Sequence, residues 1–145
     1  MSTATPSPAR ETSPAAARLR VADAMHRGVL TCRRSSSLGY VAGVMAGRRV
    51  HCVVVTDEAD GENLWGVVSD MDLVAAASVR DLDEQSAGAT AATAVLTVPP
   101  GETLQRAAQV MTEHAAAHLV VVDPETGRPV GVLSTLDVAA ALAAP

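Results

Sequence analysis

The sequence predicts an α/β (α+β) fold built from two copies of one βαββα unit. One set of residues recurs in the same order at an offset of about 66 positions, which is the signature of an internal repeat. Within each copy, continuous apolar runs typical of buried strands alternate with apolar residues at helical spacing. Neither copy alone, at under about 60 residues, should bury enough surface to be stable. We therefore expect the two copies to pack together.

The repeat divides the chain along its length. The clearest matches are VLT at 29–31 and 95–97, HCVVV at 51–55 and HLVVV at 118–122, and GVVSDMD at 66–72 and GVLSTLD at 131–137. An Ala- and Val-rich chain produces accidental matches, but not so many in one order with gaps only at turns. The predicted divisions are a disordered tail at 1–14, a first repeat with a lead-in helix at 15–80, a linker at 81–90, and a second repeat at 91–145.

The segment before the first repeat changes character along its length. The Ser, Thr and Pro of MSTATPSPARETSP have almost nothing to bury, so we expect disorder there. From Ala15 to Met25 the composition is helical, with Leu19 and Ala22 at helical spacing and Gly28 as a stop signal. This run predicts one short lead-in helix.

Each copy then begins with a strand and a helix. The strands are predicted at Val29–Cys32 and Val95–Val98, and a polar turn follows each of them. Amphipathic helices are predicted at Ser37–Ala46 and Thr103–Ala115, with apolar residues along one face.

A hairpin follows in each copy. Its first strand, His51–Val55 or His118–Val122, is continuously apolar, as in strands buried on both faces. Turn residues lead to a second strand, Leu64–Val68 or Val130–Leu133.

Each copy closes with an Ala-rich helix, at Met71–Val79 and at Leu136–Ala144. These helices carry apolar residues on more than one face, and one pair of repeats cannot bury both faces. We therefore expect a homodimer.

Composition excludes several functional classes. A net charge of -5 without a basic stripe disfavours nucleic-acid binding. No apolar run approaches the roughly 18 residues of a transmembrane helix. The N-terminus lacks the pattern of a secretory signal, so Cys32 and Cys52 are expected to be reduced and the protein cytoplasmic. The near absence of Lys, Asn, Ile and Phe indicates a GC-rich bacterial genome.

The segments GVVSDMD and GVLSTLD carry the sharpest chemical signal. Each has a Gly in a strand, a hydroxyl at the strand-to-helix junction (Ser69, Ser134) and a carboxylate one turn into the helix (Asp72, Asp137). A helix N-terminus offers N–H groups and partial positive charge to phosphate, and a carboxylate accepts from the two hydroxyls of a ribose. The same spacing is also a capping box that only satisfies helix N–H groups. Its repetition in register favours a ligand site, although both roles can coexist.

Taken together, these residues resemble a tandem pair of CBS domains, the regulatory unit named after cystathionine β-synthase and also called a Bateman module. The resemblance rests on VADAM at 21–25, VLTVPPGETLQRAAQVM at 95–111, AHLVVVD at 117–123 and the two GxxSxxD segments. It covers about residues 21–144. It implies that two repeats pack by their sheets into a pseudo-twofold disc, with clefts that hold AMP, ADP, ATP or an S-adenosylmethionine-like compound. In such families, paired discs usually meet through the closing helices.

The resemblance also implies roles for particular residues. Asp137 and Asp72 would bind ribose, and Ser134 and Ser69 would face phosphate. At the first strands, Thr31 and Thr97 would line the cleft. His51 and His118 begin the central strands, where family members often place a basic side chain near phosphate, although such a His is also often structural. We expect the stronger site at Asp137 and Ser134, in the copy with Thr97 and the more typical surroundings.

Two further sets of residues are not assigned to a binding site. Arg33, Arg34, Arg48 and Arg49 occur only in the first copy, which puts equal occupancy of the two clefts in doubt, and we expect them at the surface. His114 and His118 have the spacing of metal ligands on a helix, but a change from helix to strand falls between them and no third ligand is nearby. We predict no metal site.

We therefore predict a stand-alone regulatory module that binds an adenosine ligand and signals to a separate, unknown partner protein. No nucleophile with a neighbouring base, paired carboxylates or Walker-type loop is present, so an enzyme and a catalytic cofactor are not expected. The alternative is a ligand-free interaction module whose GxxSxxD segments act only as helix caps.

Overall fold

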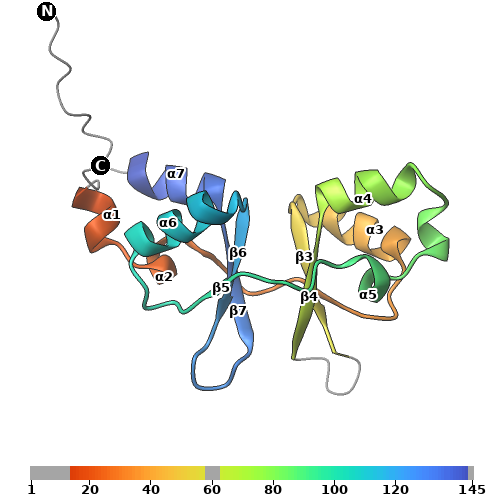
Figure 1. Cartoon of the computed structure of the whole chain (residues 1–145), viewed down its shortest axis with the longest axis horizontal. Coiled ribbons are helices and arrows are strands. Elements are labelled where there is room, and N and C mark those ends of the chain that lie inside the picture. Colours follow the sequence, from red (N-terminus) through yellow and green to blue (C-terminus); the bar gives the residue numbers. More distant parts are fainter. Residues whose placement is uncertain (1–13, 58–62, 144–145) are drawn as a thin grey trace, which may run out of the picture.

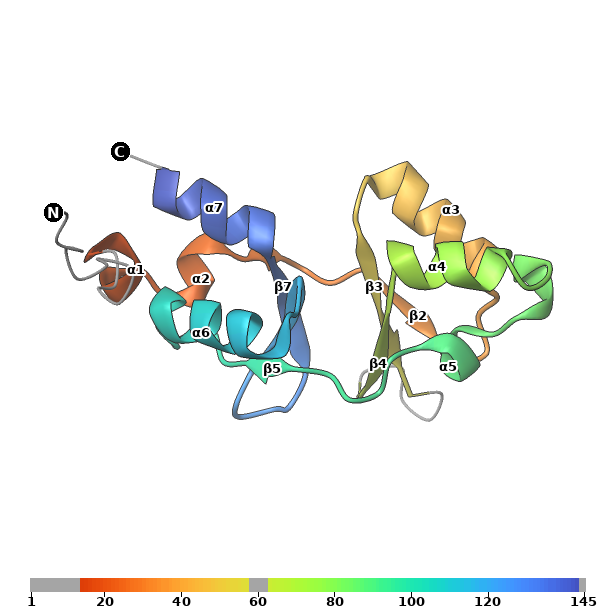
Figure 2. The same cartoon turned by 45° about the horizontal axis from the view of Figure 1, so that its top comes forward.

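The computed structural model describes residues 14–57 and 63–143. Its strands form two sheets that lie next to each other in the middle of the molecule, with the helices of each copy on the outer side (Figures 1 and 2). This is the predicted α/β (α+β) architecture of two βαββα repeats packed by their sheets. The predicted tail lies outside the described residues except for Pro14, which begins the first helix.

The sheet of the first copy has three strands in the order β2-β3-β4. Its strands are β2 (Thr31–Arg33), β3 (Cys52–Thr56) and β4 (Leu64–Ser69). The first two are parallel, and β3 and β4 form the predicted antiparallel hairpin. Part of the predicted turn between them, 58–62, lies outside the described residues.

The sheet of the second copy has four strands in the order β1-β7-β6-β5. Its own strands are β5 (Thr97–Val98), β6 (His118–Val122) and β7 (Pro129–Ser134), paired as in the first copy. The fourth strand, β1 (His26–Arg27), comes from the chain before the first copy and pairs antiparallel with β7. The sequence predicted one strand at 29–32, whereas the chain forms β1 on one sheet and β2 on the other.

The helices agree with their predicted positions to within a few residues. They are α3 (Leu38–Arg48) and α6 (Leu104–His114) after the first strands, and α4 (Asp70–Ala77) and α7 (Thr135–Ala143) after the hairpins. Ser37 and Thr103 cap α3 and α6 by accepting backbone N–H groups of the first turn.

The lead-in segment forms two short helices, α1 (Pro14–Arg18) and α2 (Val21–Ala24), so the prediction of one continuous helix is wrong. The break has a tertiary cause. At Leu19 the carbonyl accepts from the Leu104 N–H over 2.9 Å, and Arg20 forms a bridge with Thr103. The backbone there pairs with the start of α6 instead of continuing its own helix.

The segment between the copies is structured as well. It contains a 3₁₀ turn, η2 (Leu82–Glu84), and a short helix, α5 (Ala87–Thr90), that pack on the first copy. Ser86 forms a bridge with Ser37, which repeats the pairing of Arg20 with Thr103. The lead-in therefore covers the second copy, and the inter-copy segment covers the first.

Two apolar cores result, one on the outer side of each sheet. The first includes Leu38 and Val53 together with Ala87 of the inter-copy segment, and the second includes Leu104 together with Val21 of the lead-in. Val54 and Val120 are buried but belong to neither core. Because side chains alternate along a strand, they point from the opposite faces of their sheets, into the space between the copies. This confirms that the central strands are buried on both faces.

Candidate functional site

Both GxxSxxD segments form complete capping boxes. The Ser69 N–H donates to Asp72 Oδ2 over 2.8 Å, and the Asp72 N–H donates to Ser69 Oγ over 3.2 Å. At the second motif the Ser134 N–H donates to Asp137 Oδ2 over 2.8 Å, and the Asp137 N–H donates to Ser134 Oγ over 3.1 Å. Each carboxylate therefore stands at the N-terminus of a closing helix and already accepts one backbone N–H.

The Gly of each motif lies where another backbone segment passes close to the strand. A Cβ on Gly131 would lie 2.5 Å from the carbonyl oxygen of His26, and one on Gly66 would lie 2.6 Å from that of Ala92. Neither contact is possible without movement of the backbone. The motif Gly thus leaves room for the segment that connects the two copies to pair with the second strand of the hairpin.

These crossing segments, residues 25–31 and 91–97, carry Thr31 and Thr97. Ala92 pairs with Val67 of the first copy, and Thr97 then pairs with Val120 of the second. The other segment makes the reverse passage through β1 and β2. The segment next to the strand that leads to Asp137 is therefore the one with Thr31, whereas the sequence analysis had grouped Asp137 with Thr97. Both threonine side chains are exposed.

The carboxylates differ in their surroundings. The Oδ1 atom of Asp137 lies 2.8 Å from Nε2 of His26, and the side chain of Asp137 is only 9% exposed while that of His26 is 80% exposed. Asp72 is less deeply buried, and its Oδ1 makes no hydrogen bond or ion pair within the described part of the chain. The contact of His26 was not foreseen, since no local pattern connects it with Asp137.

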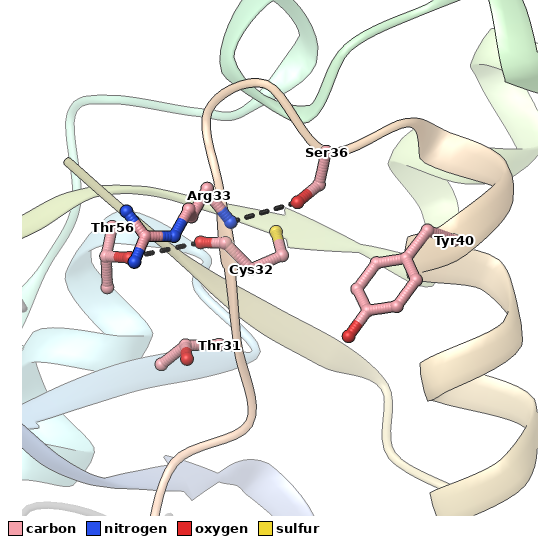
Figure 3. A pocket seen from close by; sticks show the side chains of 6 residues that line it. All are labelled: Thr31, Cys32, Arg33, Ser36, Tyr40 and Thr56. Atoms are coloured by element: carbon pink, nitrogen blue, oxygen red, sulfur yellow. Dashed lines mark hydrogen bonds between the residues drawn. The ribbon is translucent and has the colours of Figure 1, made fainter. Parts of the chain in front are cut away.

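A cavity of about 370 Å³ opens beside Thr31. Its lining comes from β2, the following turn, α3 and β3, namely Thr31, Cys32, Arg33, Ser36, Tyr40 and Thr56 (Figure 3). Tyr40 extends from α3 towards β2 and is 58% exposed (Figure 3). The turn is held by the Arg33 N–H, which donates to Ser36 Oγ over 3.0 Å. Sequence reasoning missed these residues except Thr31, although Tyr40 is the only tyrosine of the chain.

The arginines of the first copy do not share one role. Arg33 contributes to the cavity, and Arg34 stacks on Trp65, with its guanidinium carbon 3.6 Å from the ring centroid. The indole N–H of Trp65 donates to the carbonyl of Gly88 over 3.3 Å. The general assignment of these arginines to the surface is therefore wrong for Arg34, which is partly buried and anchors the inter-copy segment.

His51 and His118 lie near the junction of the copies, among the same acidic groups. His51 Nδ1 is 3.0 Å from Asp70 Oδ2, and this hydrogen bond lowers the pKa of Asp70 below its ordinary value. Burial lowers the pKa of His118, a shift to which the nearby His51 adds, while Asp70 and Asp137 oppose it. The structure thus brings both predicted histidines into one electrostatic environment.

The thiols are free and buried. Burial raises the pKa of Cys32 to about 11, and burial together with the charges of Asp70 and Asp137 raises that of Cys52 to about 11. Thiols with such pKa values are poor nucleophiles near neutral pH. Across residues 14–57 and 63–143, no group of three or more His, Cys, Asp or Glu side chains is arranged to hold a metal ion. The same ranges contain no helix of the length and apolarity needed to cross a membrane.

The fold is shared with solved structures of known proteins. The CBS domain protein PAE2072 from Pyrobaculum aerophilum, complexed with AMP, is 31% identical over 82% of this chain and 89% of that chain, with a TM-score of 0.75. The CBS-domain protein ATU1752 from Agrobacterium tumefaciens is 29% identical over 83% and 89% of the chains, with a TM-score of 0.72. CBSX2, in complex with AMP, is 26% identical over 84% and 94%, with a TM-score of 0.71.

A search of the curated proteins finds no significant match. The family model of the CBS domain, in contrast, matches twice, at residues 21–79 and 88–144, which agrees with the repeat found in the sequence. Because these two matches cover most of its length, the chain belongs to the CBS domain family and carries two CBS domains in tandem.

Proposed function

We propose that this protein is a regulatory module that binds an adenosine nucleotide or a related adenosyl compound between its two CBS domains and signals to a separate protein. The observation that carries the proposal is the pair of register-matched Ser-Asp motifs at the N-termini of α4 and α7. Two of the similar solved structures are complexes with AMP. No catalytic role is proposed.

The chemistry of the motifs suits such a ligand. In each motif one carboxylate oxygen accepts a backbone N–H, and an ionised carboxylate has lone pairs left for two hydroxyl groups. Asp72 and Asp137 are therefore assigned to ribose, and Ser69 and Ser134 to the phosphate side. His51 and His118 are assigned to phosphate, because His51 directly precedes β3 and His118 begins β6, near the junction of the copies.

The crossing segments supply the remaining assigned contacts. Thr31 lines the cavity of about 370 Å³, which is within the usual size range of small-molecule sites. Tyr40 offers an aromatic face in the same cavity, and Arg33 adds a cation. Thr97 holds the matching position on the other crossing segment. An adenosine ligand at Asp137 would use Thr31, and one at Asp72 would use Thr97.

Calorimetry with AMP, ADP, ATP, S-adenosylmethionine and NAD tests the proposal, after ligand carried through purification has been removed. Asp137→Ala should remove the ribose contacts, and charge-assisted hydrogen bonds are worth about 1.5–3 kcal/mol, so affinity should fall about ten- to a hundredfold. Asp72→Ala should have a smaller effect. The matched control is Asp123→Ala, which removes a carboxylate from the hairpin turn of the second copy and should leave affinity unchanged.

Two outcomes would contradict the proposal in different ways. If no compound binds below about millimolar concentration, the motifs are helix caps only. If one binds and Asp137→Ala remains folded with unchanged affinity, the assignment of the site is wrong although binding is real. A pull-down in which no protein is retained in a nucleotide-dependent manner would contradict the signalling part.

A second candidate function is a ligand-free dimerisation module. It is favoured by the complete capping boxes, which satisfy the helix N-termini without any ligand. It is also favoured by exposed apolar side chains on the closing helices, among them Met71 and Leu136, each 71% exposed. These two residues occupy the same position in their copies, and α4 and α7 run along the same side of the molecule (Figure 1).

We propose that this side meets a second copy in a homodimer, since a twofold axis matches like surfaces on both partners. Light scattering at micromolar concentration should give twice the chain mass for the wild type. Met71→Asp combined with Leu136→Asp should give the monomer mass without loss of the circular dichroism spectrum. A monomeric wild type would contradict the dimer.

A further inference from the structure

The contact between His26 and Asp137 has no counterpart in the other copy. His26 is in β1, opposite Val132 of β7, and its imidazole reaches the carboxylate Oδ1 at 2.8 Å. In the first copy the same strand position is Val67, and the residue opposite it is Ala92. An alanine therefore stands where the second copy has a histidine, and its methyl group cannot reach a carboxylate.

The histidine occupies part of the surface that a ribose would need. One oxygen of Asp137, Oδ2, accepts the Ser134 N–H, and the other, Oδ1, faces the imidazole. With the carboxylate only 9% exposed, two ribose hydroxyls cannot approach it while His26 keeps this position. At Asp72, no side chain of the described residues makes a hydrogen bond or ion pair with Oδ1.

The imidazole can be displaced at small cost. It is 80% exposed, and β1 is held through its backbone pairing with β7, so the ring can rotate away without disturbing the strand. Because the imidazole side of the contact is open to solvent, we expect its release to change affinity by at most about fivefold, or about 1 kcal/mol. His26 would therefore reduce, by at most about fivefold, the advantage that we assign to the cleft at Asp137 over the one at Asp72.

We infer that His26 competes with the ligand for Asp137, and that the cleft at Asp72 lacks such a competitor. The inference rests on the proposed function, because it concerns how the same adenosine site is regulated. The second cleft opens only when a ligand replaces the imidazole, whereas the first is open without such a step. Because β1 follows directly after the lead-in segment, occupancy of the second cleft would also change the contacts at the end of that segment.

The experiment measures AMP binding by calorimetry with one cleft weakened at a time. Asp72→Asn keeps an oxygen for the Ser69 N–H and weakens the first cleft. In that background, His26→Ala should tighten AMP binding two- to about fivefold. In the Asp137→Asn background, Ala92→His should weaken AMP binding by a similar factor, since it installs the same competitor over Asp72.

Arg27→Ala is the matched control, because it shortens the neighbouring residue of β1, whose side chain points to the opposite face of the strand. It should not tighten AMP binding at Asp137. Circular dichroism and thermal melting should establish that every variant is folded. In the Asp72→Asn protein, the ring resonances of His26 should shift when AMP is added.

The outcomes separate this inference from the proposed function. AMP binding that is unchanged or weakened by His26→Ala would overturn the competition and leave the adenosine site intact. Unchanged binding after Ala92→His would overturn the explanation of the asymmetry. If AMP and the other adenosyl compounds bind to none of the proteins, the wild type included, the proposed function fails and this inference fails with it.

Discussion

The two CBS domains have nearly the same backbone and different chemistry at matching positions. Both hairpins have the same pairing, including a shift of register between the last two residues of β3 and of β6. Both motifs cap a helix with the same hydrogen bonds. The second carboxylate contacts His26, and at the position that matches His26 the first copy has Ala92, which pairs with Val67. Matching backbone positions therefore carry different side chains, and the surroundings of the carboxylate can change without a change of the fold.

The lead-in and the inter-copy segment also differ from each other, although each of them covers one of the two domains. Each domain is completed by the chain that precedes the other one, through Val21 in one core and Ala87 in the other. The first copy adds the stacking of Arg34 on Trp65, which fastens its covering segment. This exchange predicts that the two domains do not unfold independently.

The largest expected effect comes from truncating the buried leucine at the start of α3 or α6. Leu38→Ala and Leu104→Ala each remove a fully buried side chain from a different core, so each should cost about 2–5 kcal/mol of unfolding free energy. Denaturant titration monitored by circular dichroism should give one transition in both variants. The reason is that each core contains a segment of the chain that precedes the other domain. Two separate transitions would mean that the domains are independent.

A smaller loss should follow from substitution of the motif glycines. Gly131→Ala and Gly66→Ala would each force a methyl group against the carbonyl of a crossing segment, at a cost of about 1–3 kcal/mol. Gly43→Ala is the control, because that glycine lies in α3 with open space around it and alanine favours helix. Thermal melting should show a lower Tm for both motif variants and an equal or higher Tm for the control. A motif variant as stable as the wild type would contradict the close approach.

The smallest effect concerns pH and distinguishes the two central histidines. Burial lowers the pKa of His118, so the unfolded chain binds more protons than the folded one as the pH falls through 6.5, its ordinary value. The free energy of unfolding should therefore decrease between about pH 7.5 and about pH 5, and less so in His118→Gln. Denaturant titrations at both pH values measure the difference.

His51→Gln is the counterpart in the first copy. The hydrogen bond from His51 lowers the pKa of Asp70, and a carboxyl group with a depressed pKa contributes stability above its ordinary value that is lost as the pH falls further. This variant should therefore be less stable than the wild type above pH 3.8, the ordinary pKa of that carboxyl group, and the difference should shrink as the pH falls below that value. If His51→Gln changed the pH dependence of stability between about pH 7.5 and about pH 5 as strongly as His118→Gln, the assignment of the shifts would be contradicted.

Much of the fold could be predicted because it depends on local sequence patterns. The runs at His51 and His118 are too apolar to face water on either side, and the helix starts carry their own caps. The lead-in helix was predicted wrongly because its composition favours a helix throughout, while pairing of Leu19 with Leu104 interrupts it. Helix propensity depends on the local residues only, so it cannot indicate a pairing with a residue as distant in the sequence as Leu104.

By itself the sequence determined the repeat, the order of the strands and helices within each βαββα unit, and the residues of the two capping motifs. Each of these depends on neighbours within a few positions, where periodicity and hydrogen-bonding capacity decide the structure. Only the tertiary structure decided which crossing segment pairs with which hairpin, and hence that His26 contacts Asp137 while Ala92 has the matching position opposite Val67. The physical reason is that these contacts follow from the packing of two sheets and the exchange of their covering segments, which bring together side chains far apart in the chain.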